Sequence, residues 1–225
     1  MKKAETVLTE THAVTVEGPS FAIQGDLGIP AGAVGVVLFA HGSGSSRMSP
    51  RNRFVAEVLR SSGLATLLID LLTFDEEKVD AETGRLRFDI EFLTERLVLA
   101  TDWLKEESST KELQIGYFGA STGSAAALVA ATRRPRDIKA IVSRGGRPDL
   151  AERALPEVKA PTLLIVGGAD LLVLDLNEEA LGLLNVEKEL AIVPGATHLF
   201  EEAGALERVA ELAKEWFLRY LGVQA

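Results

Sequence analysis

The chain has 225 residues, 47% of them hydrophobic, which suits a single α/β domain over residues 1–225 with a sizeable core. Its formal net charge of −9 argues against a nucleic acid partner, and no apolar run reaches the roughly 18 residues that cross a bilayer. Because cysteine is absent, disulfides, a thiol nucleophile and zinc sites built on cysteine are excluded.

The chain starts with Met1–Glu10, which lacks the apolar stretch of a signal peptide, and we expect a cytoplasmic protein. Two opening strands are predicted at His12–Glu17 and Phe21–Leu27, around Gly18-Pro19. Short apolar runs and helical patterns then alternate. In chain order these are strand Val34–Ala40, helix Phe54–Arg60, strand Ala65–Ile69, helix Phe88–Lys105, strand Leu113–Phe118, helix Ser124–Arg133, strands Ile138–Val142 and Thr162–Val166, helix Glu178–Leu184, strand Leu190–Val193 and helix Ala205–Tyr220.

This alternation predicts an α/β fold whose mostly parallel sheet is covered by helices on both faces. Only Ser143–Asp149 separates one strand from the next helical stretch, which leaves no room for a cap domain. In such a fold the active site lies at the carboxyl ends of the strands, so chemistry is expected in the loops that follow them.

A Gly-x-Ser-x-Gly pattern, Gly119-Ala120-Ser121-Thr122-Gly123, lies between a predicted strand and a predicted helix. The sharp turn would lift the hydroxyl of Ser121 above the sheet, and the glycines let the neighbouring backbone approach closely. The alternative is a glycine-rich turn in which the serine merely caps the helix. Candidates for a base, an acid and oxyanion donors elsewhere in the chain favour a nucleophile over a helix cap.

A serine nucleophile needs a base, and the chain has three histidines. His12 lies in the opening strands, and His41 ends a strand where a role in organising the loop is favoured. His198 follows the last strand in a loop that begins Pro-Gly. A loop in that position can hold a base over the nucleophile, so His198 is the predicted base.

The base needs an acid that fixes its tautomer and stabilises the imidazolium. Asp170 lies just beyond the carboxyl end of a predicted strand and is the first candidate, with Asp175 as the reserve. Asp70 also ends a strand but precedes the serine. The order serine, acid, histidine is that of hydrolases with a nucleophile elbow, so Asp170 is preferred.

The developing oxyanion needs backbone N–H donors. One should come from Thr122, the residue after the nucleophile. The second should come from the Gly/Ser-rich loop 41–47, where Ser43 is the first choice and Gly44 the second. A loop that cradles phosphate is the rival interpretation, but it lacks the ending of a P-loop and the spacing of a dinucleotide-binding fingerprint.

Together these segments resemble the α/β-hydrolase superfamily, and within it the dienelactone-hydrolase-like group. The match spans nearly the whole chain and rests on His41-Gly42-Ser43-Gly44-Ser45, Gly119-Ala120-Ser121-Thr122-Gly123, Gly167-Gly168-Ala169-Asp170 and Gly195-Ala196-Thr197-His198. The resemblance implies an eight-stranded sheet, the same three catalytic residues, ester, thioester or lactone substrates, and no cofactor. Dienelactone hydrolases use a cysteine nucleophile, so the serine here favours a carboxylesterase.

The loops around the inferred site carry apolar side chains, which suggest a small, uncharged acyl group as substrate. The predicted substrate pocket consists of His41, Met48, Phe74, Leu171, Leu172 and Phe200. Arg144 and Arg147 flank Gly145-Gly146 beside the site and support the competing idea of a substrate carboxylate.

The expected partner is therefore a small-molecule ester, with no nucleic acid, membrane or metal, and the protein is expected to be a monomer or homodimer. Two other functions remain open. One is a binding module on the same fold that does no catalysis. The other is a thioesterase, peptidase or acyltransferase that uses the same three residues, since each passes through a similar acyl-enzyme.

Overall fold

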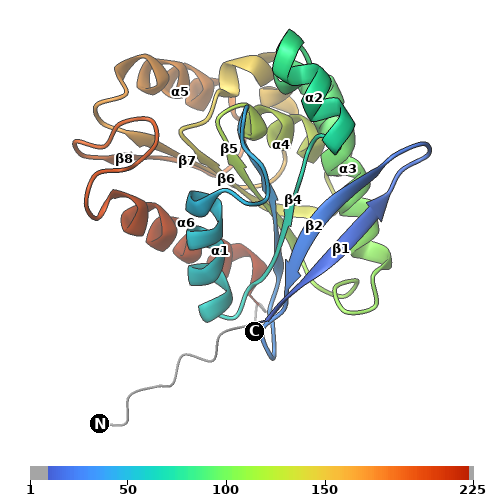
Figure 1. Cartoon of the computed structure of the whole chain (residues 1–225). Helices are drawn as coiled ribbons and strands as arrows, with labels where there is room; N and C mark the ends of the chain where they lie inside the picture. The colour runs from blue at the N-terminus through green and yellow to red at the C-terminus, as the bar shows by residue number, and fades with distance from the viewer. Residues whose placement is uncertain (1–9, 223–225) are drawn as a thin grey trace.

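Eight strands form one sheet in the order β1-β2-β4-β3-β5-β6-β7-β8 (Figure 1). This computed structural model describes residues 10–222, so nearly all of the Met1–Glu10 segment lies outside the described residues. The strands are β1 (Thr11–Glu17), β2 (Ala22–Gly28), β3 (Val36–Ala40), β4 (Ala65–Ile69), β5 (Ile115–Ala120), β6 (Ile138–Arg144), β7 (Thr162–Gly167) and β8 (Lys188–Val193).

The predicted eight-stranded, mostly parallel sheet is confirmed. Strands β3 to β8 run parallel to one another, whereas β1 and β2 form an antiparallel hairpin that joins the sheet along β4. Strands β3, β4, β5 and β7 are buried along their whole length, which explains their largely apolar sequences.

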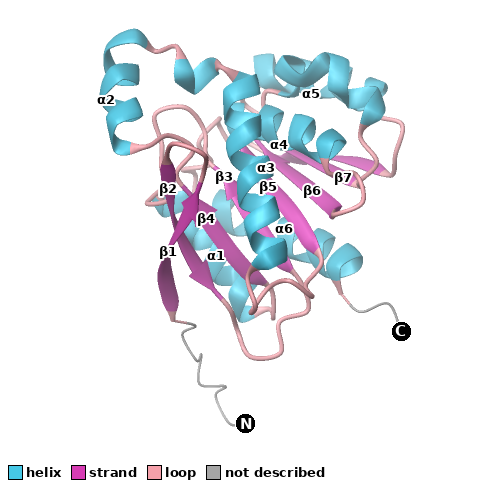
Figure 2. Ribbon diagram, turned by 90° about the vertical axis from the view of Figure 1, so that its right-hand side faces the viewer, coloured by secondary structure: helices cyan, strands magenta, loops and turns pink. Residues whose placement is uncertain are grey.

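Helices cover both faces of the sheet (Figure 2). The helices are α1 (Pro50–Ser61), α2 (Phe74–Thr83), α3 (Ile90–Glu106), α4 (Thr122–Arg133), α5 (Leu171–Leu183) and α6 (Ala205–Leu221), with 3₁₀ segments at Leu86–Phe88 and Pro148–Glu157. Apolar side chains of α1 and α6 pack on one face, and those of α3, α4 and α5 pack on the other. No helix within residues 10–222 has the length and apolar character needed to span a bilayer.

The two faces bury separate cores. Tyr117 points into the α3–α4 side, where its hydroxyl hydrogen-bonds to Thr101 Oγ1 at 2.5 Å. The rings of Phe39 and Phe118 pack on the α1–α6 side with centroids 4.8 Å apart. Tight packing on both faces holds the strand ends rigidly, and these ends carry the loops of the candidate site.

One helix was not expected from the sequence. Helix α2 has an exposed, charged surface, and Asp80 is its one buried residue, so it lacks the apolar stripe of an amphipathic helix. Its start nevertheless has a capping box, in which Thr73 Oγ1 accepts from the N–H of Glu76 and the Glu76 carboxylate accepts from the N–H of Thr73. The sequence Thr-x-x-Glu could have located this helix.

Helix α5 begins seven residues before the predicted start, at Leu171 rather than Glu178. The run Leu171-Leu172-Val173-Leu174 is continuously apolar, so it shows no helical period. Leu171 and Leu172 are therefore helix residues and not part of a loop, and their side chains are 67% and 72% exposed.

Candidate active site

Ser121 lies in the sharp turn between β5 and α4, with φ 50° and ψ −121°. Positive φ is unusual for a residue with a side chain and marks a constrained backbone. Its N–H donates to the carbonyl oxygen of Arg144 at 3.3 Å, which ties the turn to the end of β6. Although Ser121 occupies the N-cap position of α4, its side chain makes no capping hydrogen bond. The structure therefore contradicts the capping interpretation.

The glycines on either side of Ser121 lie where no side chain fits. A Cβ on Gly119 would lie 2.4 Å from Ser124 Cα, and a Cβ on Gly123 would lie 2.4 Å from the carbonyl oxygens of Ala40 and His41. Such approaches are shorter than real contacts of a Cβ atom. The start of α4 thus packs directly against β5 and the end of β3, which fixes the height of Ser121 above the sheet.

Gly119→Ala is expected to destabilise the protein by about 1–3 kcal/mol, because backbone must move to admit the methyl group. Urea unfolding would measure the loss. Gly182→Ala is the matched control, since that position lies inside α5 with nothing within 4 Å of its Cβ. There the same methyl group should stabilise by about 0.5–1 kcal/mol. Equal effects of the two changes would contradict the packing argument.

The predicted base and acid meet at one edge of the sheet. His198 Nδ1 lies 2.7 Å from Asp170 Oδ2. Asp170 takes the N-cap position of α5 but makes no capping bond, so its carboxylate is directed to the histidine. The reserve acid, Asp175, is exposed on α5. An Nδ1–H donor to the carboxylate leaves Nε2 of His198 as the nitrogen able to accept a proton.

The segment 144–147 connects Ser121 with the histidine loop. The N–H of Arg147 donates to the carbonyl oxygen of Ser121 at 3.1 Å. A Cβ placed on Gly145 would lie 3.5 Å from His198 Cε1. Within residues 10–222 no hydrogen bond joins the Ser121 hydroxyl to His198. In unliganded enzymes such contacts are often long and tighten only when substrate binds.

The Gly/Ser-rich loop after β3 lies directly over the turn, because a Cβ on Gly42 would be 3.0 Å from Ser121 Cβ. The backbone N–H groups of Ser43 and Thr122 donate no hydrogen bond to any part of the chain between residues 10 and 222. Both residues line a cavity of about 550 Å³ that extends toward α2. Among the described residues the two predicted oxyanion donors are thus unpaired, and both of their residues line one cavity, whereas Ser121, Asp170 and His198 do not line it.

His41 is almost fully buried and organises this loop. Its Nδ1 lies 2.9 Å from the carbonyl oxygen of Gly42, and its Nε2 lies 3.0 Å from the backbone nitrogen of Leu71. Since Leu71 N–H can only donate, Nε2 accepts and Nδ1 carries the proton. Burial lowers the pKa of His41, although the bond to Gly42 and the charge of Asp70 oppose this effect. The imidazole is therefore neutral, and it connects the loop after β3 to the loop after β4.

Lowering the pH is expected to decrease the free energy of unfolding through protonation of His41. Burial keeps its folded-state pKa below the ordinary histidine value of 6.5. As the pH falls below that value, the unfolded chain takes up a proton that the folded protein excludes, so the free energy of unfolding decreases. His41→Gln should be about 1 kcal/mol less stable at neutral pH, because hydrogen bonds are lost, but should lose less stability on acidification. Urea unfolding on both sides of that pH tests this.

His12→Gln serves as the control for this pH experiment, because His12 is exposed on β1. Its stability profile should follow that of the wild type. If His41→Gln and the wild type lost stability in parallel, His41 would have no part in the acid sensitivity.

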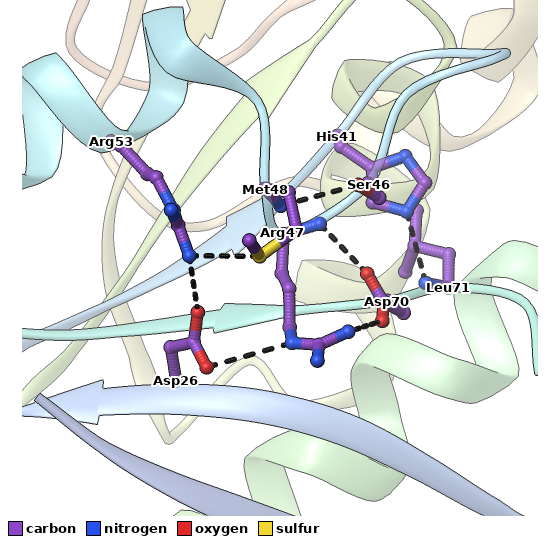
Figure 3. Close-up of polar contacts among 8 residues, drawn as sticks. All are labelled: Asp26, His41, Ser46, Arg47, Met48, Arg53, Asp70 and Leu71. Atoms are coloured by element: carbon purple, nitrogen blue, oxygen red, sulfur yellow. Dashed lines mark hydrogen bonds and ion pairs between the residues drawn. The ribbon is translucent and has the colours of Figure 1, made fainter.

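A second set of contacts anchors the far end of the loop (Figure 3). The backbone N–H of Arg47 donates to Asp70 Oδ1 at 2.7 Å, and its guanidinium pairs with the other oxygen of Asp70. Arg47 Nε also lies 3.5 Å from Asp26 Oδ1, and Arg53 reaches Asp26 at 3.1 Å. Carboxylates from β2 and from the end of β4 therefore hold this end of the loop on the sheet.

The structure separates the six residues predicted for the substrate pocket. His41 and Met48 line the cavity. Phe74 is 74% exposed at the start of α2, and Leu171 and Leu172 point to solvent, so these three do not line the cavity. Phe200 is 1% exposed, and with φ 56° it lies in the core between α6 and the sheet. Its assignment to the pocket was wrong, because the left-handed turn directs its ring inward.

The cavity wall is also more polar than the sequence suggested. Its charged residues are Arg51, Glu77, Asp80 and Arg87. Most of these come from α2 and the segment after it, so they could not be assigned while that helix went unrecognised. Of the two arginines named beside the site, Arg147 pairs with Asp149 at 2.7 Å, whereas Arg144 is buried at the end of β6. Within residues 10–222 no three histidine or acidic side chains gather as metal ligands.

A mostly parallel sheet, a serine in the turn after β5, and an acid and a histidine on later loops define the α/β-hydrolase fold. Comparison with protein families agrees with this class. The model of the dienelactone hydrolase family matches residues 23–222, and the chain belongs to that family.

The crystal structure of a dienelactone hydrolase from Anabaena variabilis is 62% identical in sequence, has a TM-score of 0.93, and covers 95% of this chain and 99% of its own. A serine hydrolase without a lid from Xanthomonas campestris shares the fold at 19% identity and a TM-score of 0.74, over 94% of this chain and 95% of its own. Between residues 10 and 222, likewise, no extra domain interrupts the sheet.

A Mycobacterium tuberculosis protein, provisionally named as a phosphoribosyl transferase, is 53% identical over 218 residues. The match covers 97% of this chain but 48% of that protein. The chain thus spans about half the length of this curated relative. About half of that protein lies outside the matched part, and its name refers to the whole molecule.

Proposed function

We propose that this hydrolase cleaves carboxylic esters, thioesters or lactones through an acyl-enzyme on Ser121. The observation that carries the proposal is the 2.7 Å contact between His198 Nδ1 and Asp170, at the edge of the sheet where Ser121 also follows a strand with a hydroxyl that caps no helix. A base held by an acid next to a free hydroxyl is the arrangement that activates a serine.

In the proposed reaction, Ser121 Oγ attacks the acyl carbon while His198 Nε2 takes the hydroxyl proton. Asp170 holds the imidazole in the required tautomer and stabilises its positive charge. The negative charge that develops on the acyl oxygen is stabilised by the N–H groups of Ser43 and Thr122. His198 then protonates the leaving group, and the same residues activate water to release the acid.

The family supports acyl chemistry at this site. The Anabaena relative is named a dienelactone hydrolase, and a lactone is a cyclic ester. Because this chain has no cysteine, the proposed nucleophile is the serine at the turn. With four charged residues in its wall, the cavity does not support the apolar acyl group expected from the sequence.

The test is covalent labelling with a fluorophosphonate probe, read by intact mass, with Ser121→Ala as the control. One adduct on the wild type and none on the variant would support the proposal. A folded wild type that takes up no label would contradict it and favour a binding module. Incubation of the acylated enzyme with water, an amine and an alcohol would then separate hydrolysis from acyl transfer.

A further inference from the structure

Two consecutive residues at the end of β4 hold both ends of the loop that follows β3 (Figure 3). At the near end, the backbone N–H of Leu71 donates to His41 Nε2 at 3.0 Å. At the far end, the carboxylate of Asp70 accepts from the backbone N–H of Arg47 at 2.7 Å and pairs with the guanidinium of the same residue. Residues 42–46 therefore lie between two anchor points on the end of one neighbouring strand.

The anchored loop lies between β4 and the turn that carries the nucleophile. Strand β3 pairs with β4 on one side and with β5 on the other. A Cβ on Gly42 would approach Ser121 Cβ to 3.0 Å and the carbonyl oxygen of Ala120 to 3.2 Å. The position of the loop above Ser121 is thus set from the β4 side by the anchors and limited from the β5 side by direct contact.

The segment between the anchors contains Ser43, the predicted oxyanion donor. The N–H of Ser45 donates to the carbonyl oxygen of Gly42 at 3.2 Å, so Ser43 and Gly44 are the central residues of a turn. Gly44 has φ 68°, which glycine adopts without strain. The N–H of Ser43 has no partner among residues 10–222, so its direction depends on where the ends of the turn are held.

Asp70 serves this loop and not the catalytic histidine. Its side chain is only 13% exposed, and both of its oxygens are satisfied by Arg47. Asp170, which pairs with His198, follows β7, four places from β4 in the sheet and about 19 Å away at the usual strand spacing. Asp70 is therefore a buried carboxylate that the proposed reaction does not otherwise use.

We propose that Asp70 is a positioning residue for the oxyanion hole, acting through the backbone of Arg47 to hold the N–H of Ser43 toward the acyl oxygen. The inference rests on the proposed function for its catalytic consequence, but not for the anchoring itself. A group misplaced by about 1 Å can cost a hundredfold in rate. Because negative charge develops on the acyl oxygen only in the transition state, a displaced donor lowers kcat and leaves substrate binding nearly unchanged.

The kinetic test is hydrolysis of nitrophenyl acetate by Asp70→Ala. We expect kcat to fall about 100-fold while KM stays within about twofold of the wild-type value. Asp70→Asn should recover about tenfold of that loss, since an amide oxygen can still accept from the N–H of Arg47. Asp102→Ala is the matched control and should keep the wild-type kcat. It removes a carboxylate that pairs at 2.6 Å with Arg134, at the opposite end of α4 from Ser121.

Inhibitor binding separates positioning from a general loss of structure. Ser121 Oγ attacks the carbonyl carbon of trifluoroacetophenone: the new C–O bond forms as the carbonyl π bond breaks, the hydroxyl proton passes to His198, and the ketone oxygen becomes an oxyanion. Acetophenone binds without forming a stable adduct. In Asp70→Ala the Ki of the trifluoro compound should rise by the factor by which kcat falls, whereas the Ki of acetophenone should stay near the wild-type value.

Amide hydrogen exchange of peptides that cover residues 42–49 tests the anchor without catalysis. Exchange there should be faster in Asp70→Ala than in the wild type and unchanged in Asp102→Ala. Arg47→Ala removes the guanidinium but keeps the backbone N–H, so it should change both exchange and kcat to a smaller extent. This variant carries the test if Asp70→Ala fails to fold.

The outcomes decide between the explanations. A folded Asp70→Ala with wild-type kcat would overturn the positioning role. Equal losses in kcat, in KM and in the binding of both ketones would also overturn it and leave Asp70 a structural residue. If the wild type neither hydrolyses esters nor takes up the probe on Ser121, the proposed function fails, and the exchange measurement alone decides whether Asp70 anchors the loop.

Discussion

Ser121→Ala is expected to lower kcat for an activated ester by roughly a millionfold, the size of effect seen when a serine hydrolase loses its nucleophile. Without the hydroxyl no acyl-enzyme forms, and the remaining rate comes from the oxyanion donors and from substrate binding. The fold should be preserved, because the Ser121 side chain makes no capping hydrogen bond.

The measurement is steady-state hydrolysis of a nitrophenyl ester by wild type and variant prepared in parallel. Ser109→Ala is the control, since Ser109 is an exposed serine beyond α3. Its activity should equal that of the wild type. A Ser121→Ala variant that hydrolyses the ester at the wild-type rate would show that the nucleophile lies elsewhere.

Asp170→Asn should reduce kcat by about 10⁴-fold. The carboxylate accepts from His198 Nδ1, and an amide directed at the same atom can stabilise the wrong tautomer, with the proton on Nε2. A histidine in that state cannot take the proton from the serine. The change should have little effect on stability, because the two side chains stay hydrogen-bonded.

Asp175→Asn is a close control for this prediction, because it removes the same charge five residues away on the exposed face of α5. It should retain full activity. Both variants should be compared by kcat and by melting temperature. Loss of activity in both, or in neither, would contradict the assignment of Asp170 as the acid.

Most of the fold could be predicted from the sequence, because its central strands are buried on both faces. A run such as Ala65–Ile69 is apolar at every position, and the structure begins and ends β4 at these same residues. Helices with an apolar stripe, such as α6, were also located correctly. Helix α2 and the first turns of α5 were missed because their sequences follow no helical period.

The candidate site was predictable to the extent that its residues follow strands. Ser121, Asp170 and His198 each come after a strand, and the carboxyl ends of parallel strands meet at one edge of the sheet. The walls of the cavity depend on side-chain directions, which the sequence does not reveal. Phe200 turns inward at a left-handed residue, and Arg144 is recognisable as unpaired only when its surroundings are known.

The backbone of Ser121 has a consequence for how this protein would respond to selection. A side chain held at φ 50° stores about 1–3 kcal/mol of strain, which glycine would relieve. Ser121→Gly should therefore melt at a higher temperature than Ser121→Ala, although both lack the hydroxyl. A screen for heat resistance alone would drift toward glycine at this position, whereas a screen for turnover would keep serine. At this one residue, thermal stability and catalysis favour different side chains.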